Sequence, residues 1–104
     1  MIEWKMAEMI GYTPITTFWE DFSIADLFGV KGIQDTYDTA FENWKDDYKY
    51  LTELVMVLNH KIWQWYEVDE KRAELYDKLW RQTVNYAQKN LKDEELRYYY
   101  EVTD

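Results

Sequence analysis

The stretch LTELVMVLNHKIWQWY, residues 51–66, is the strongest indication of how this chain folds. Its large apolar residues, with one more just before it, recur at steps of three and four, which places them on one side of an α-helix. They are Tyr48, Leu51, Val55, Leu58, Ile62 and Trp65. Other apolar residues widen this face and leave a narrow polar wedge of Lys49, Glu53, His60 and Gln64. We therefore expect a central helix that other helices cover on most sides.

The composition is typical of one helical domain. The chain has 104 residues and no linker-like tract, so we assign residues 1–104 to a single domain. Apolar residues make up 47% of the chain, which is enough for a core, and three Gly and one Pro leave few turns, which favours helices over a sheet. The absence of Cys excludes disulfides and thiolate chemistry and is consistent with the reducing cytoplasm.

Local signals before the central stretch predict further helices. The first ten residues are expected to form a short amphipathic helix that Gly11 ends. Thr17 and Glu20 have the spacing of a capping box, which predicts one helix or two short turns up to Gly29. The next helix is expected over residues 32–45, because its apolar residues share one face.

Aspartates mark the expected starts of the later helices. Asp46 and Asp47 favour a junction before the central helix, although the apolar pattern also allows one continuous helix. Asp69 is expected to cap a long amphipathic helix, and Asp93 a short last one. The connections are short, which implies antiparallel neighbours. The sequence thus predicts an all-α bundle of three main helices with short N-terminal and C-terminal helices.

The sequence contains no motif of a catalytic, metal or cofactor site. His60 is the only histidine, and no nucleophile or orienting group is spaced to work with it. Glu-x-x-His, an EF-hand loop and glycine-rich phosphate loops are all absent from the sequence. We therefore expect a protein that is not an enzyme, with no catalytic residue, metal or cofactor, and we interpret His60 as a partly exposed helical residue.

The net charge limits the class of partner. The chain has 21 acidic and 12 basic residues, for a net charge of −9. Direct binding to nucleic acid or anionic lipid is therefore disfavoured. The longest apolar run, residues 54–58, is far too short to span a membrane. A basic protein is the partner that this charge would attract.

Most of the excess acid lies in two segments. Residues 20–47 have a net charge of −6 and residues 93–104 of −4, whereas residues 48–92 have a net charge of +2. In the first segment, acids form a row opposite the apolar face: Asp35, Asp38, Glu42, Asp46 and Asp47. Carboxylates on a helix advance roughly 4.5–6 Å per step and phosphates about 3.4 Å, so the row is a candidate mimic of nucleic acid. The alternative is that the row is only the solvated side of an amphipathic helix.

Aromatic side chains outside the predicted apolar faces form a second candidate surface. The chain has six Trp and ten Tyr. Tyr50, Trp63 and Tyr99 fall outside those faces, and exposed Trp and Tyr are favoured anchors of interfaces. These residues support an alternative function, in which the protein is an interaction or assembly module without catalytic activity. Such a module could be a homodimer.

Four stretches of the sequence share a general likeness with one group of proteins: DFSIADLFGVKGIQDTYDTAF (residues 21–41), YKYLTELVMVLNHKIW (48–63), YAQKNL (86–91) and EEL (94–96). They resemble small acidic proteins of unassigned function from mobile elements and phages of gut bacteria. The resemblance includes no motif with known chemistry. It implies a setting in which small acidic proteins disable host defence nucleases by occupying nucleic-acid surfaces. Charge and resemblance together predict a cytoplasmic inhibitor of the anti-restriction or anti-CRISPR type, which binds a basic surface of a nucleic-acid-handling enzyme or complex.

Overall fold

The computed structural model describes residues 15–103, and this part of the chain is helical, with no strand. Its five helices are α2 (Phe18–Leu27), α3 (Gly29–Trp44), α4 (Tyr48–Trp65), α5 (Glu70–Asn90) and α6 (Asp93–Thr103). The prediction of an all-α fold is confirmed. The short helix expected before Gly11 lies outside the described residues.

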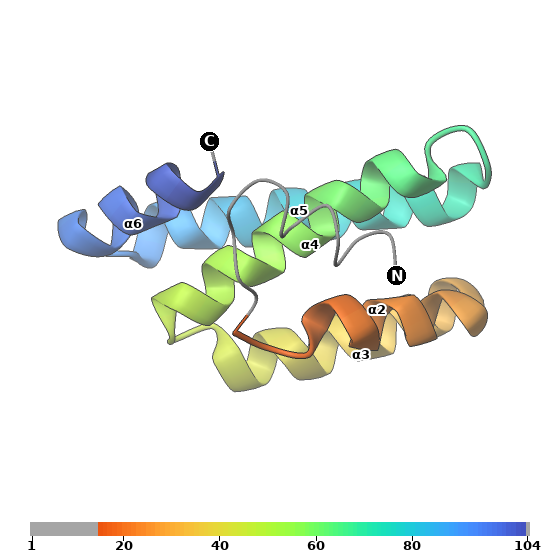
Figure 1. Ribbon diagram of the computed structural model, residues 1–104, viewed down its shortest axis with the longest axis horizontal. Coiled ribbons are helices and arrows are strands. Elements are labelled where there is room, and N and C mark those ends of the chain that lie inside the picture. Colours follow the sequence, from red (N-terminus) through yellow and green to blue (C-terminus); the bar gives the residue numbers. More distant parts are fainter. Residues whose placement is uncertain (1–14, 104) are drawn as a thin grey trace.

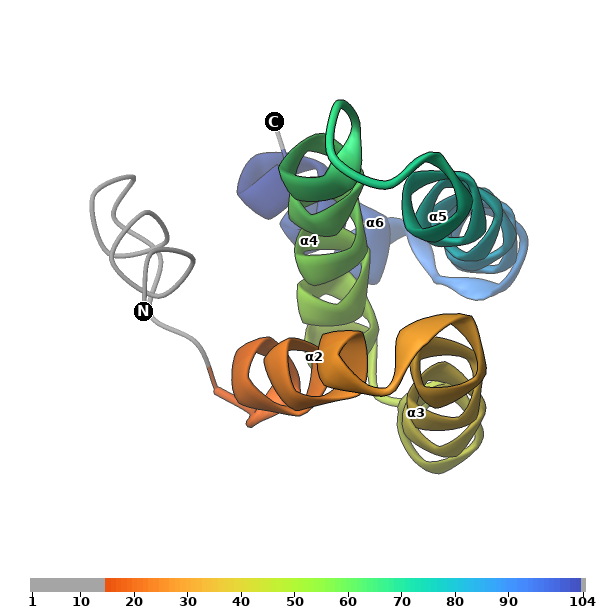
Figure 2. The same ribbon diagram turned by 90° about the vertical axis from the view of Figure 1, so that its right-hand side faces the viewer.

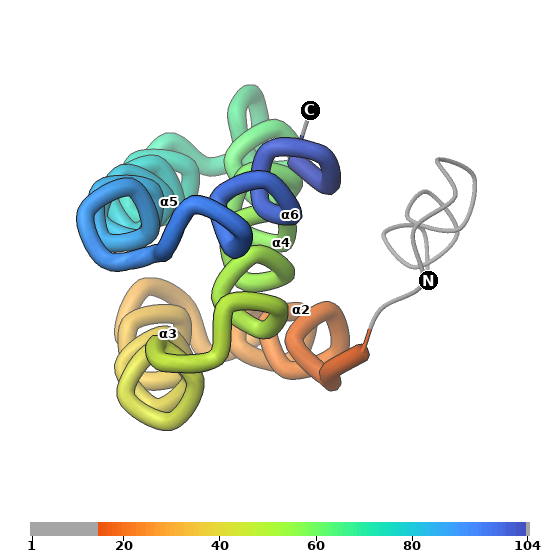
Figure 3. The backbone as a smooth tube through the Cα atoms, turned by 90° about the vertical axis from the view of Figure 1, so that its left-hand side faces the viewer, coloured from red at the N-terminus to blue at the C-terminus, as the bar shows by residue number. Residues whose placement is uncertain are grey.

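Helix α4 lies at the centre and contacts each of the other four described helices. Helices α2 and α3 form one antiparallel pair, and α4 and α5 form a second pair that packs against the first (Figure 1, Figure 2). Helix α6 lies along α4, at the end opposite to the turn between α4 and α5 (Figure 3). The helices enclose two adjoining apolar clusters, and α4 contributes residues to both.

The apolar face predicted for α4 is buried or half-buried along its length: Tyr48, Leu51, Val55, Leu58, Ile62 and Trp65. The polar wedge is less open than expected. Glu53 is fully buried, and its carboxylate accepts a hydrogen bond of 3.1 Å from the backbone N–H of Ile15. The exposure expected for Glu53 is therefore wrong, because Ile15, which lies just before α2, bonds to it on this side of α4.

The tight turn between α2 and α3 depends on two glycines. Gly29 has a φ of +75°, a left-handed conformation that residues with a side chain rarely adopt. At Gly32, an added Cβ would lie 2.6 Å from the Cβ of Phe28 and 3.0 Å from the carbonyl oxygen of Ala25. Since Gly29 turns the chain within a single residue, α3 begins there and not at position 32 as expected.

Aspartate side chains cap two of the long helices, as predicted. Asp47 accepts hydrogen bonds of 3.1 and 3.4 Å from backbone N–H groups in the first turn of α4. Asp69 accepts hydrogen bonds of 3.1 and 3.2 Å from the corresponding groups of α5. The cap at Asp47 shows that residues 30–66 form two helices and not one.

Two other expected capping hydrogen bonds are not formed, although Thr17 does stand at the N-cap position of α2. Thr17 makes no capping hydrogen bond, and its hydroxyl instead donates to the Asp21 carboxylate at 2.9 Å. Asp93 lies within α6, and the Glu95 carboxylate accepts a hydrogen bond of 2.9 Å from the backbone N–H of Lys92 just before it. In both helices an acid inside the first turn bonds to a group that precedes the helix.

Candidate functional site

The exposed side of α3 carries three carboxylates of the predicted acidic row. Asp35, Asp38 and Glu42 follow one another at steps of three and four residues, and all three are exposed. They face outwards because the opposite side of α3 is buried in the core through Ile33 and Tyr37. The exposure predicted for these acids is confirmed, and their binding role stays a prediction.

A buried hydrogen bond holds α3 in place beneath the row. The Tyr37 hydroxyl lies 2.9 Å from the Thr83 hydroxyl of α5. Burial raises the pKa of Tyr37, the hydrogen bond to Thr83 acts in the opposite direction, and the charge of Asp38 adds to the rise. Tyr37 therefore stays neutral at physiological pH and joins α3 to α5 by a hydrogen bond between uncharged groups.

The last two acids of the row do not lie on α3. That helix ends at Trp44, and Asp46 and Asp47 are exposed in the turn before α4. Asp47 caps α4, and one carboxylate oxygen of Asp46 lies 3.4 Å from the Tyr86 hydroxyl. The junction expected at Asp46 and Asp47 is confirmed, so the acidic row continues from α3 into the turn before α4.

Two lysines lie near the row without covering it. The ammonium of Lys31 is 3.9 Å from the Asp35 carboxylate, and that of Lys45 is 3.6 Å from the Glu42 carboxylate. The two acidic side chains remain 65% and 76% exposed, so water and salt screen both pairs. Asp21 of α2 shares with Asp35 a hollow of about 440 Å³ between the two helices. We call the carboxylates of Asp21, Asp35, Asp38, Glu42, Asp46 and Asp47 the acidic face.

The three aromatic residues proposed to bind a partner differ in their exposure. Trp63 is exposed, as expected. Tyr50 is half-buried, and its ring centroid lies 4.3 Å from that of Trp44. Tyr99 is only 4% exposed, so the expectation of an exposed Tyr99 is wrong. The cause is that α6 packs Tyr99 into the apolar cluster that contains Leu51 of α4.

The high Trp and Tyr content predicts a groove among the helices, and the structure contains one, whose place the sequence did not indicate. It lies between the C-terminal half of α4 and the N-terminal half of α5 and has a volume of about 900 Å³. Its lining includes three apolar residues and three acids: Trp63, Tyr66, Val68, Glu67, Glu70 and Glu74. We call it the α4–α5 groove. The one-turn spacing of Glu70 and Glu74 is visible in the sequence, but the sequence does not show which side chains lie opposite them.

Residues 15–103 contain no group of three or more His, Asp or Glu side chains placed to hold a metal ion. His60 is half-buried, and its ring centroid lies 5.4 Å from that of Trp19 on α2. None of the helices in the described part of the chain is long and apolar enough to cross a membrane.

Comparison with protein-family models, curated proteins and solved structures finds no significant match to this chain. The evidence for function therefore comes from the geometry and charge of the acidic face and of the α4–α5 groove.

Proposed function

We propose that the acidic face binds a basic surface of a protein that handles nucleic acid and thereby blocks that surface. The observation that carries this proposal is the exposure of Asp35, Asp38 and Glu42 along one side of a helix that is fixed from beneath. The protein would then act as an inhibitor of the anti-restriction or anti-CRISPR type, on a cytoplasmic enzyme or complex.

The density of charge on the acidic face supports this kind of partner. The three carboxylates on α3 are spread over about 10 Å of helix axis, whereas one nucleic-acid strand presents a phosphate about every 3.4 Å. Asp21 and the two turn aspartates add to this density. Six carboxylates against two nearby lysines leave a net charge of −4 on the acidic face. A surface of this charge attracts a basic site and accelerates its encounter with it.

The order of α3 favours binding as well. Its backbone is helical from Gly29 to Trp44, and the bond between Tyr37 and Thr83 anchors it to α5. Carboxylates on an ordered helix do not lose backbone freedom when a partner binds. More of the electrostatic attraction is therefore available for affinity than in a disordered acidic segment.

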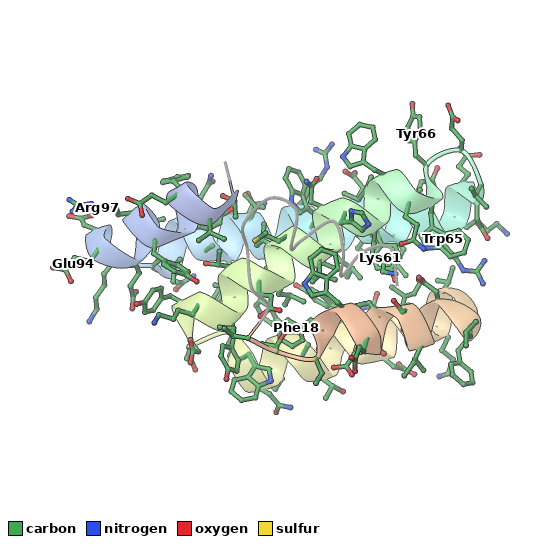
Figure 4. All side chains as sticks on the ribbon, viewed as in Figure 1. Phe18, Lys61, Trp65, Tyr66, Glu94 and Arg97 are labelled. Carbon is green, nitrogen blue, oxygen red and sulfur yellow. The ribbon has the colours of Figure 1, made fainter. Side chains whose placement is uncertain are left out.

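Two variants with the same change in net charge test the proposal. Asp38→Lys/Glu42→Lys reverses charges on the acidic face, and Glu94→Lys/Glu101→Lys reverses exposed charges on α6. Figure 4 shows Glu94 at the outer end of α6, on a different helix from the acidic face. The first variant should bind a captured partner at least about tenfold more weakly than the wild type does, because like charges then meet at the interface.

The control variant should bind the partner as the wild type does, and both variants should keep the helical far-UV circular dichroism spectrum. Duplex DNA should displace the wild-type protein from the partner, and binding should weaken as salt is raised. Equal binding by the two variants, or binding that DNA and salt leave unchanged, would refute the proposal.

A further inference from the structure

The α4–α5 groove has a wall of exposed apolar side chains. Trp63 and Tyr66 are 67% and 61% exposed, and their ring centroids lie 5.6 Å apart. Val68, in the turn that follows, is 73% exposed. Tyr66 extends away from the bundle, whereas Trp65 lies on the side of α4 that faces α2 (Figure 4). Large apolar side chains gathered at a concave surface are typical of a binding site, while singly exposed ones are ordinary.

The same groove carries carboxylates without a cationic partner nearby. Glu67, Glu70 and Glu74 form no ion pair within residues 15–103. Asp77, farther along α5, pairs with Arg81 at 2.9 Å. The lining has four acids and no Lys or Arg of the described chain; since Asp77 is paired with Arg81, the other three acids leave a local charge of −3. A concave surface of one sign concentrates the opposite charge.

A neighbouring contact shows the chemistry that suits such a surface. The guanidinium of Arg72 lies over the ring of Trp65, 4.9 Å from its centroid, and is also paired with the Asp69 carboxylate. Arginine combines well with an aromatic face and a carboxylate, because its planar cation stacks on the ring while its N–H groups donate to the acid. The groove presents the same two kinds of group, with no cation between them.

We propose that the α4–α5 groove binds a segment of a partner protein that presents an arginine beside apolar side chains. The guanidinium would lie between Trp63 and the carboxylates of Glu70 and Glu74, and the apolar neighbours would fill the rest of the groove. A second copy of this chain is a poor occupant, since pairing two such grooves would bring six glutamates together. This proposal does not depend on the acidic face.

The groove is long enough for a peptide segment. A second hollow of about 300 Å³ shares Asn59 and Trp80 with it and reaches Tyr100 of α6. From Glu70 to Val84, α5 extends about 20 Å, which matches about six residues of extended chain. The unpaired glutamates lie at the end near the turn between α4 and α5. The arginine should therefore lie at that end, and apolar residues should lie towards α6.

Two peptides test whether binding in the groove requires a positive charge. One is a short capped peptide with an arginine flanked by leucines. The other has citrulline in place of the arginine, which has nearly the same shape but carries an uncharged urea group. Each is titrated into the full chain by calorimetry, with the indole N–H signals followed by NMR. The arginine peptide should bind at least about tenfold more tightly.

Variants of the groove identify where the peptide binds. Trp63→Ala should weaken binding of the arginine peptide about tenfold, as expected for an aromatic anchor. Glu70→Gln/Glu74→Gln should weaken it at least about threefold, and the matched Glu94→Gln/Glu101→Gln control should leave it unchanged. Trp63, Glu70 and Glu74 are not in the core, so these variants are expected to fold.

The variant Asp38→Lys/Glu42→Lys separates this proposal from the proposed function, since it should still bind the arginine peptide. Absence of binding, equal binding of the citrulline peptide, or full binding by Trp63→Ala would overturn the proposal for the groove. A dimer in sedimentation that Trp63→Ala dissociates would also overturn it, because the groove would then be an interface between copies.

Discussion

A buried ion pair between α2 and α4 gives the sharpest test of how this bundle is stabilised. The Lys61 ammonium lies 2.8 Å from one oxygen of Asp26, and the Tyr76 hydroxyl donates to the other at 2.5 Å. Lys61 is 0% and Asp26 7% exposed. Figure 4 shows Lys61 between α4 and the α2–α3 pair. The variant Asp26→Asn keeps the size of the side chain, removes its charge and replaces one of its two acceptor oxygens by an N–H donor.

The expected cost follows from burial. Removing one partner of a buried ion pair typically costs about 3–5 kcal/mol. A domain of this size has a total stability of about 5–15 kcal/mol, so Asp26→Asn should remove a large part of it. Lys61→Met should cost a similar amount, because it leaves the Asp26 carboxylate buried beside Tyr76.

The double variant Asp26→Asn/Lys61→Met is the informative comparison. It removes both charges, and an uncharged pair of similar volume often equals a buried ion pair in stability. The double variant should therefore be at least about 2 kcal/mol more stable than the sum of the two single effects predicts. This coupling separates the loss of a partner from the general disruption of the core.

Urea unfolding, followed by far-UV circular dichroism, gives the free energy of unfolding of the wild type, the two single variants and the double variant. The denaturant dependence of the unfolding free energy should stay the same in each, which shows that the variants unfold from similar native states. A loss below about 1 kcal/mol in Asp26→Asn, or single effects that simply add, would contradict the view that these charges depend on each other.

Three smaller changes test other features of the fold, each by urea unfolding. Gly29→Ala should cost about 1–2 kcal/mol, because it places a side chain at a left-handed position. Tyr37→Phe should cost about 1 kcal/mol through its lost bond to Thr83. Burial raises the pKa of Tyr37 above 10.0, so the hydroxyl's contribution is present below that pH and is lost as pH rises through the raised pKa; wild type and variant should converge there. The hydrogen bond from the Arg72 backbone N–H lowers the pKa of Asp69 below 3.8, so its contribution is present above pH 3.8 and is lost as pH falls through the lowered pKa; Asp69→Ala should lose less stability over that acid range than the wild type does.

The sequence predicts best what depends on neighbours along the chain. The apolar face of α4 follows from spacing, and the caps at Asp47 and Asp69 involve side chains and backbone groups two and three residues apart. The exposure of Asp38 and Glu42 follows from the burial of the opposite side of α3. Each of these features is set within a few residues of the chain, which is the range over which helical periodicity acts.

The sequence fails where a distant segment decides the surroundings. Glu53 belongs to a polar wedge by its position on α4, but Ile15, far away in the sequence, covers it. Tyr99 lies on a short helix whose packing direction no local pattern sets. The net charge of the sequence gives no sign of the acidic α4–α5 groove, because residues 48–92 have a net charge of +2, although no Lys or Arg of the described chain lines the groove.

The burial of Lys61 changes how the charge of the chain should be counted. Lys61 belongs to the basic middle segment and Asp26 to the acidic one, yet both are removed from the surface as a pair. Two acidic surfaces formed by the remaining charges lie on different helix pairs: the acidic face on α2, α3 and the turn that follows them, and the groove on α4 and α5. They differ in kind, since the acidic face offers carboxylates on an open helix and the groove adds aromatic rings in a hollow. Salt should therefore weaken binding at the acidic face more than binding in the groove, where burial of apolar surface contributes and does not depend on ionic strength in the same way.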